Sequence, residues 1–268
     1  MTRMTINIKV NKTTEKVLIK RDRLFFFVFS SMAIIFINVR NFFFTKLDAE
    51  MKDSGKKNKS RSVAVVVAHP DDETLWAGGT ILEHPEWNCY IITLCRASDT
   101  DRAPKFFKVL NFLGAKGEMG DMDDGPDQNP LHEIDVQECI LQLLPDPHFD
   151  LVITHDPAGE YTSHLRHEET SKAVINLWCN KKILTNEIWT FAYEDGKKKY
   201  LPKPIKNAYF YFDLPAEIWQ KKYQIITEIY GFNKDSFEAQ TTPHAEAFWQ
   251  FTHPDQARQW LNKGGNKL

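Results

Sequence analysis

The chain has 268 residues, of which 42% are hydrophobic and 26% are charged, as in an ordinary globular protein. Its formal net charge is −2 and no basic stripe lies outside the N-terminal part, which argues against nucleic acid as a partner. The four cysteines form no CxxC pair, so they predict free thiols in a reducing compartment and not a disulfide framework.

Residues 1–61 form an N-terminal segment in which a basic and hydrophobic part is followed by a polar linker. The apolar run over residues 24–44 is interrupted by Arg40, so its unbroken part falls short of the roughly 20 residues that cross a bilayer. It predicts either a membrane segment or a non-native extension. The polar stretch after Met51 favours a cytoplasmic protein that begins near that residue. The alternative is a single-pass protein anchored through residues 24–44.

The first chemical motif follows an apolar run. Residues 63–68 are continuously apolar and rich in valine, which predicts a strand buried on both faces of a parallel sheet. His69-Pro70-Asp71-Asp72-Glu73 comes directly after it, and a helix is expected over residues 74–83. Because open α/β sheets bind ligands at the carboxyl ends of their strands, this polar cluster is a candidate site. A helix cap with a charged first turn is the structural alternative.

The rest of the chain alternates between strands and helices. This order predicts one α/β domain over residues 62–268, a Rossmann-like three-layer α/β/α fold with a mainly parallel sheet. The acidic stretch 120–130 predicts a solvated surface turn. The expected strands are 88–94, 150–154, 187–193 and 208–212, and the expected helices are 104–113, 134–144, 163–178 and 215–230.

A second cluster follows the strand at 150–154. His164 and His167 are three residues apart on an expected helix, so both side chains can face one site. Imidazole and carboxylate groups are suitable zinc ligands, and catalytic zinc takes three protein groups and a water. His155 has no partner at a telling spacing and is not expected in the site. The two clusters together predict a metal centre.

With AHPDDE at the first strand and a later His-x-x-His, the chain resembles the PIG-L/LmbE family of zinc-dependent N-deacetylases over residues 62–195. The resemblance implies a Zn²⁺ ion, or another divalent transition metal, held by His69, Asp72 and His167. It implies a hydrolase that removes an N-acetyl group by metal-activated water attack. The implied substrate contains N-acetylglucosamine or a related amino sugar, as a small molecule or a glycolipid. Membrane contact is expected only through residues 24–44.

The same resemblance assigns roles to three further residues. Asp71 would be the general base, and His164 would stabilise the oxyanion and protonate the leaving amine. Arg102 falls where the family has an arginine that contacts substrate. Two alternatives remain open, a zinc amidase acting on a sugar–thiol conjugate and a non-catalytic sugar-binding module of the same fold.

One departure from the family pattern concerns the second motif. Many members have His-Pro-Asp-His, in which the acid orients the first histidine, whereas this chain has Leu165-Arg166 between the two. Asp156 and Glu168 are therefore candidates for orienting His164. Arg166 itself is expected on a solvated helix face.

Overall fold

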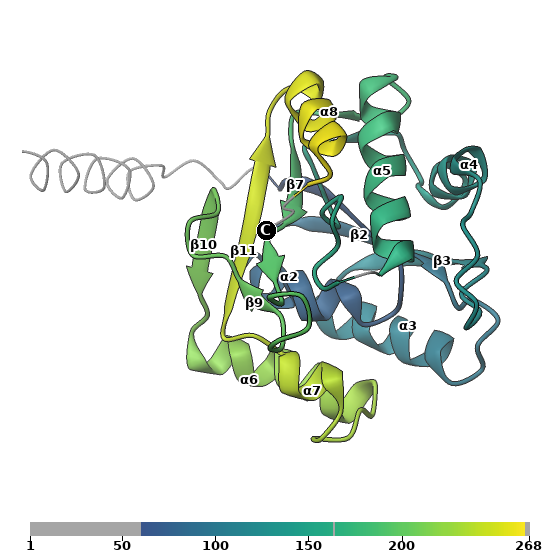
Figure 1. Cartoon of the computed structure of the whole chain (residues 1–268). Helices are drawn as coiled ribbons and strands as arrows, with labels where there is room; N and C mark the ends of the chain where they lie inside the picture. The colour runs from purple at the N-terminus through teal and green to yellow at the C-terminus, as the bar shows by residue number, and fades with distance from the viewer. Residues whose placement is uncertain (1–59, 163, 266–268) are drawn as a thin grey trace, which may run out of the picture. The chain divides into compact units, whose positions relative to one another are not determined.

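The computed structural model describes residues 60–162 and 164–265, which form the coloured part of Figure 1. The predictions for the N-terminal segment, a membrane segment at 24–44 and a start near Met51, lie outside these residues. In the described part of the chain, no helix combines the length and the apolar character that a membrane span requires.

The fold is built on a seven-stranded sheet with the strand order β10-β11-β7-β5-β1-β2-β3. Neighbouring strands from β7 to β3 in this order are parallel, and β11 is antiparallel to both β7 and β10. This confirms the predicted α/β class with a mainly parallel sheet. The strands are β1 (Ser62–Val67), β2 (Asn88–Cys95), β3 (Lys116–Met122), β5 (Leu151–Thr154), β7 (Ile188–Phe191), β10 (Phe210–Asp213) and β11 (Ala245–Phe251).

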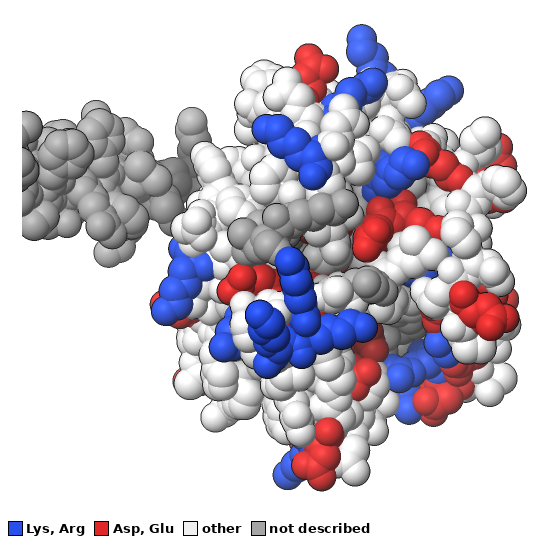
Figure 2. All heavy atoms as spheres, in the orientation of Figure 1, with Lys and Arg blue, Asp and Glu red and all other residues white. Residues whose placement is uncertain are grey.

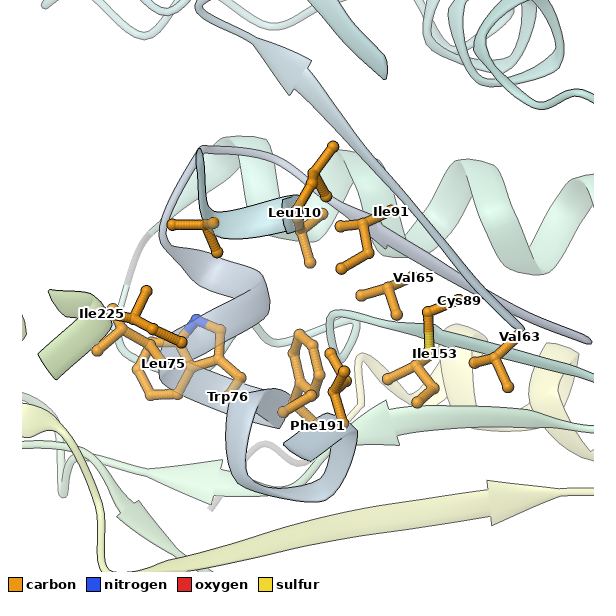
Figure 3. Packing of buried hydrophobic residues seen from close by; sticks show 14 of the residues in the cluster. Val63, Val65, Leu75, Trp76, Cys89, Ile91, Leu110, Ile153, Phe191 and Ile225 are labelled. Atoms are coloured by element: carbon orange, nitrogen blue, oxygen red, sulfur yellow. The ribbon is translucent and has the colours of Figure 1, made fainter. Parts of the chain in front are cut away.

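Strand β1 lies at the centre of the core because both of its faces are covered. Val63, Val65 and Val67 pack into one apolar cluster, part of which Figure 3 shows. Ala64 and Val66, which alternate with them, pack into a second cluster on the opposite face. All five side chains are fully buried, as expected for a valine-rich strand in the middle of a parallel sheet.

Helices cover both faces of the sheet. One layer contains α2 (Asp72–Glu83), α3 (Arg102–Leu113), α6 (Ala216–Gln224), the π-helical turn η1 (Ile225–Ile229) and α7 (Phe237–Thr241). The other contains α4 (Glu133–Leu143), α5 (Leu165–Cys179) and α8 (Pro254–Lys263). Two small sheets pair β4 (His148–Phe149) with β6 (Leu184–Thr185) and β8 (Tyr193–Glu194) with β9 (Lys203–Pro204).

Two strands of the seven-stranded sheet, β3 and β11, were not expected from the sequence. β3 occupies residues that include the start of the predicted acidic turn, and its sequence contains two glycines and no β-branched residue. Gly117 is needed there, because a Cβ at this position would lie 1.9 Å from the carbonyl oxygen of Ile91 on β2. β11 inserts near the end of the chain between β7 and β10.

The order of the strands creates a switch point beside β1. The chain runs from β1 outward through β2 and β3, and then returns to β5 on the other side of β1. β1 and β5 are parallel neighbours, with Val66 opposite Thr154, so their carboxyl ends lie together. Open α/β sheets bind ligands at such a point, because the following loops diverge and leave a crevice.

The cysteines and the surface agree with the composition. All four cysteines are free, as predicted. Burial raises the pKa of Cys89 to about 12, which keeps this thiol protonated at neutral pH. On the face shown in Figure 2, basic and acidic side chains are interspersed, as expected from the small net charge.

Candidate metal centre

The first arm of the centre is the turn that leads from β1 into α2. Asp72, the first residue of α2, is almost fully buried. Its Oδ2 accepts a hydrogen bond from the His69 backbone N–H at 2.9 Å and lies 3.1 Å from His69 Nδ1. Its Oδ1 accepts from Trp76 Nε1 at 3.0 Å. Both oxygens of Asp72 are therefore fixed, with Oδ2 facing the first histidine.

Asp71, which lies between His69 and Asp72 in the sequence, has a strained backbone conformation. Its φ of 125° lies in a region that non-glycine residues rarely adopt. The Glu73 carboxylate accepts the Asp71 backbone N–H at 3.0 Å, and Tyr230 donates its hydroxyl to the same carboxylate at 2.9 Å. This conformation turns Asp71 away from Asp72, so that two adjacent carboxylates face different partners.

Asp71 faces Arg102 at the N-terminus of α3. The two side chains form an ion pair with 3.3 Å between Arg102 Nη1 and Asp71 Oδ2. The guanidinium of Arg102 also lies over the ring of Phe232, 4.2 Å from its centroid. Burial, with the nearby charge of Asp72, raises the pKa of Asp71 well above its ordinary value, and Arg102 opposes this rise only in part.

The second arm is the turn that follows β5. His155 Nε2 accepts the Ala68 backbone N–H at 3.0 Å, so this ring nitrogen is engaged with the end of β1. Glu160 Oε2 lies 2.8 Å from His155 Nδ1 and 2.6 Å from His167 Nδ1, so one carboxylate oxygen binds both rings. Gly159, with a φ of 71°, allows the tight turn that brings Glu160 back to them.

These contacts decide which nitrogen of His167 is available. With Nδ1–H donated to Glu160, Nε2 is the nitrogen of His167 that faces the centre. This atom is buried, lies 3.2 Å from Asp72 Oδ2, and makes no hydrogen bond within the described residues. A buried nitrogen that faces a carboxylate can bind a cation once it has lost its own proton, as a metal ligand must.

The geometry therefore fits a divalent cation. His69, His164 and His167 form one set whose ligand atoms lie within 4.8 Å of one another, and Asp72, His155 and His167 form another. His155 is excluded as a ligand, because its Nε2 lone pair already accepts the Ala68 backbone N–H and its Nδ1 lies against Glu160. The two sets share His167. The expected ligands His69, Asp72 and His167 lie together, with Asp72 Oδ2 between the two rings.

The charges of the centre also call for a cation. Burial alone would raise the pKa of Asp72, but the positive charge of His167 outweighs burial and holds this pKa well below its ordinary value. For His167 burial acts to lower the pKa, and Asp72 and Glu160 raise it to about 10. Two buried carboxylates thus hold a positive charge between them, which a bound metal ion would also supply.

His164 differs from the other histidines of the centre. Burial and the charge of His167 lower its pKa to about 2, so its ring is neutral at neutral pH. Its Nδ1 is buried without a hydrogen-bond partner in the described part of the chain. Asp156 and Glu168, the two acids that the sequence offered for orienting His164, therefore do not bind this nitrogen. Asp156 Oδ2 instead accepts a hydrogen bond from Trp260 Nε1 at 2.8 Å.

A cavity of about 310 Å³ opens onto the centre. Three of the expected site residues that are not metal ligands, Asp71, Arg102 and His164, line it. The aromatic rings of Tyr161 and Phe237, from two segments of the chain, form part of its wall. Their centroids lie 5.1 Å apart. The cavity thus combines charged groups with apolar ring surface, and the ring of Tyr161 lies against the centre itself, 5.0 Å from that of His164.

Four residues of this region were missed or misplaced from the sequence. His155 and Glu160 are fully buried in the centre, although neither was expected there. Asp124 belongs to the stretch read as a solvated turn, yet its Oδ1 lies 3.1 Å from His69 Nε2. Arg166 was expected on a solvated face and is 2% exposed. For His155 its position in the sequence was a usable signal, because it directly follows β5, the strand that ends beside β1.

Comparison with known families agrees with this geometry. Residues 64–178 match the family model described as PIG-L: GlcNAc-PI de-N-acetylase, and this stretch contains both arms of the centre. This stretch of the chain is therefore a PIG-L domain. An uncharacterized protein of Acanthamoeba polyphaga mimivirus is 24% identical over 176 residues, which cover 60% of this chain and 75% of the viral protein.

Solved structures show that the chain has the PIG-L deacetylase fold. The N,N'-diacetylchitobiose deacetylase from Pyrococcus horikoshii aligns with a TM-score of 0.53 and 15% identity, over 78% of this chain and 91% of that one. A zinc-inhibited form of a teicoplanin deacetylase aligns with a TM-score of 0.51 and 13% identity, over 70% and 97%. A 4-carboxy-2-hydroxymuconate hydratase from Pseudomonas putida aligns with a TM-score of 0.50 and 17% identity, over 71% and 95%. The fold alone therefore does not decide the reaction.

Proposed function

We propose that this PIG-L family protein is a zinc-dependent hydrolase that removes an N-acetyl group from an N-acetylglucosamine-containing or related amino-sugar substrate. One observation carries the proposal: two distant stretches of the chain meet at the switch point beside β1, where the buried Nε2 of His167 lies 3.2 Å from Asp72 Oδ2 and makes no hydrogen bond within the described residues. A binding module would need no such arrangement.

In this proposal His69, Asp72 and His167 hold the metal ion, and Zn²⁺ suits a set of two imidazoles and one carboxylate. When bound, zinc lowers the pKa of its water toward about 7 and polarises the acetyl carbonyl. The tautomers support this ligand set, since Glu160 takes the Nδ1–H of His167 and leaves Nε2 for the ion.

Asp71 is assigned the role of general base. It lies beside Asp72 in the chain but points to the cavity, and its raised pKa makes it a stronger proton acceptor than an exposed aspartate. Arg102 binds Asp71 Oδ2, which leaves Oδ1 to take the proton of the attacking water. We assign to Arg102 a second role, contact with the polar groups of the substrate.

His164 is assigned hydrogen-bond donation to the oxyanion that develops on the acetyl carbonyl. A neutral imidazole suits this role, because it donates from one nitrogen without bringing a full charge into the cavity. The same neutrality argues against His164 as the source of the proton for the leaving amine. That proton is then the one taken up by Asp71, which would act as base and afterwards as acid.

An amino-sugar substrate is supported by three observations. The family model is named for a de-N-acetylase of an N-acetylglucosamine lipid. A fold neighbour is named as a diacetylchitobiose deacetylase. The cavity presents the rings of Tyr161 and Phe237, and aromatic faces pack well against the apolar faces of sugars.

The test is acetate release from a panel of N-acetylglucosaminides, with zinc restored to protein that has been treated with a chelator. We expect wild-type turnover, and a loss of about 10²–10⁴-fold in Asp71→Asn with its zinc content unchanged. Asparagine is chosen because it tolerates a positive φ better than alanine does. His69→Ala should lose both zinc and activity. Asp127→Asn, an exposed carboxylate of the same size, is the control.

Several outcomes would contradict the proposal. Full turnover in Asp71→Asn would remove the assigned base. Release of an acyl fragment other than acetate would favour an amidase that acts on a sugar–thiol conjugate. Saturable binding of the glycosides without any product would favour a sugar-binding module.

A further inference from the structure

The loop after β3 reaches the metal centre. We call residues 123–129 the acidic loop, and it begins directly after the strand with Asp123 and Asp124. The side chain of Asp124 is only 11% exposed, and its Oδ1 lies 3.1 Å from His69 Nε2. His69 thus lies between two carboxylates, with Asp72 on Nδ1 and Asp124 on Nε2.

If the nitrogen of His69 that faces Asp72 is to bind the metal ion, the proton of the ring must lie on the nitrogen that faces Asp124. An ionised carboxylate only accepts hydrogen bonds, so Asp124 is satisfied by a proton on Nε2. The lone pair of the neutral ring then lies on Nδ1, the nitrogen that faces Asp72 Oδ2 at 3.1 Å. Asp124 therefore does for His69 what Glu160 does for His167, since each acid binds the ring nitrogen that points away from Asp72.

Asp124 is itself fixed by two side chains. Arg96 donates to Asp124 Oδ2 from Nε at 2.9 Å and from Nη2 at 2.6 Å, a two-pronged contact that sets the orientation of the carboxylate. Gln128, from the other end of the acidic loop, donates to Asp124 Oδ1 at 3.2 Å. The carboxylate that binds His69 is therefore held on both oxygens.

The whole acidic loop is fastened to α5 by Arg166. This side chain is 2% exposed and donates to the carbonyl oxygens of Asp123 at 2.6 Å and Asn129 at 2.8 Å, the two ends of the loop. Glu169 neutralises it through a contact of 2.6 Å with Nη1. Arg166 precedes His167 in the sequence, so the helix that carries one expected ligand also holds the loop that acts on another.

We propose that Asp124 is a positioning residue that fixes the Nε2–H tautomer of His69 for metal binding, and that Arg166 clamps the acidic loop to keep it there. The inference rests on the proposed function in one respect, the use of His69 as a metal ligand. It gives a role to the arginine that stands between the two histidines of the second motif, and to a loop that would otherwise be a surface turn.

The experiment is a zinc titration in competition with a chromophoric chelator, which needs no substrate. We expect Asp124→Ala to bind zinc about 10–100-fold more weakly than wild type. Asp124→Asn should lose less, because its amide oxygen still accepts the His69 N–H. Arg166→Lys should also weaken binding, since an ammonium cannot bridge the two carbonyl groups as a guanidinium does. Asp127→Asn, an exposed acid of the same loop, should bind zinc as wild type does.

The absorption spectrum of the cobalt-substituted protein separates positioning from direct ligation. If Asp124 only positions His69, the bands of the Asp124→Asn protein keep their wavelengths and intensities while the affinity falls. A changed coordination spectrum would make Asp124 a ligand and overturn the inference. Equal zinc affinity of Asp124→Ala and Asp127→Asn would overturn it too, and wild-type affinity in Arg166→Lys would overturn the clamp.

Failure of this inference is distinguishable from failure of the proposed function. If His69→Ala binds zinc as tightly as wild type, His69 is not a ligand and both fail. If His69→Ala loses zinc but Asp124→Ala does not, the proposed centre stands and only the role of Asp124 is wrong.

Discussion

Glu160→Gln is the substitution that tests the architecture of the centre most directly. Glu160 is 1% exposed, and a single oxygen of it binds the Nδ1 atoms of His155 and His167. Its other oxygen accepts the backbone N–H of Asp156 at 3.1 Å. Glutamine has the same shape but only one acceptor oxygen, and its amide nitrogen would face a donor.

The expected cost follows from these contacts. With its oxygen toward the two rings, glutamine turns two hydrogen bonds to a charged carboxylate, each worth roughly 1.5–3 kcal/mol, into weaker bonds to a neutral oxygen. It also leaves the buried N–H of Asp156 without an acceptor, at a cost of roughly 1–3 kcal/mol. We expect a loss of about 2–5 kcal/mol in the free energy of unfolding of the zinc-free protein. In a domain of this size each kcal/mol lowers Tm by about 2–4 °C. Zinc affinity should fall by about 10–100-fold, because His167 loses the group that fixes its tautomer.

Thermal melting of chelated protein and a zinc titration measure the two effects separately. Glu118→Gln, the same chemical change at an exposed position of β3, is the control and should alter neither. If Glu160→Gln melted at the control's temperature and bound zinc equally well, Glu160 would not orient the histidines, and the tautomers assigned above would be wrong.

Three further predictions concern the fold around the site. Glu246 and Lys222 form a fully buried ion pair at 2.6 Å, so Glu246→Gln should cost about 3–5 kcal/mol in urea unfolding. Adding Lys222→Met should recover part of this loss, and a purely additive double mutant would contradict the pairing. The pKa of Glu133 is lowered, first by its hydrogen bond with Lys172, so its contribution is present above the ordinary glutamate pKa and is lost as the pH falls. Because this pair is partly exposed, Glu133→Gln should cost less than about 1 kcal/mol in unfolding free energy at pH 7 and less again in acid. An equal loss at both pH values would refute the pairing. Gly117→Ala would place a methyl group against a carbonyl oxygen of β2, so a melting temperature equal to that of wild type would contradict the close approach of the two strands.

The sequence predicts the centre of the fold well, because local chemistry decides it there. A continuous valine-rich run is stable in few places other than a strand covered on both faces, and β1 is such a strand. His69 and Asp72 follow it directly, and the spacing of His164 and His167 places them at the N-cap and in the first turn of α5, one residue later than the expected helix start allowed. Once β1 and β5 are parallel neighbours, these residues have to meet.

What the sequence could not show depends on contacts between segments far apart in the chain. Nothing local to Asp124 distinguishes it from its neighbour Asp123, and its place against His69 follows from the clamp of Arg166 on the loop backbone. Arg166 was predicted wrongly because an arginine on a helix is usually solvated. Here its hydrogen bonds go to main-chain carbonyl groups, which every residue has and which therefore leave no signal in the sequence. Glu160 is identified only by the pair of rings it binds.

The position of β11 has a consequence for synthesis of the protein. This strand contains some of the last residues of the chain, yet it pairs on both sides, with β7 and with β10. Until it leaves the ribosome, the apolar β7 is an open edge, and β10 has no neighbour to join. A chain that ended before Ala245 would therefore lack an interior strand of the sheet and would expose the unpaired edge of β7. We expect such truncated chains to aggregate and to have no activity.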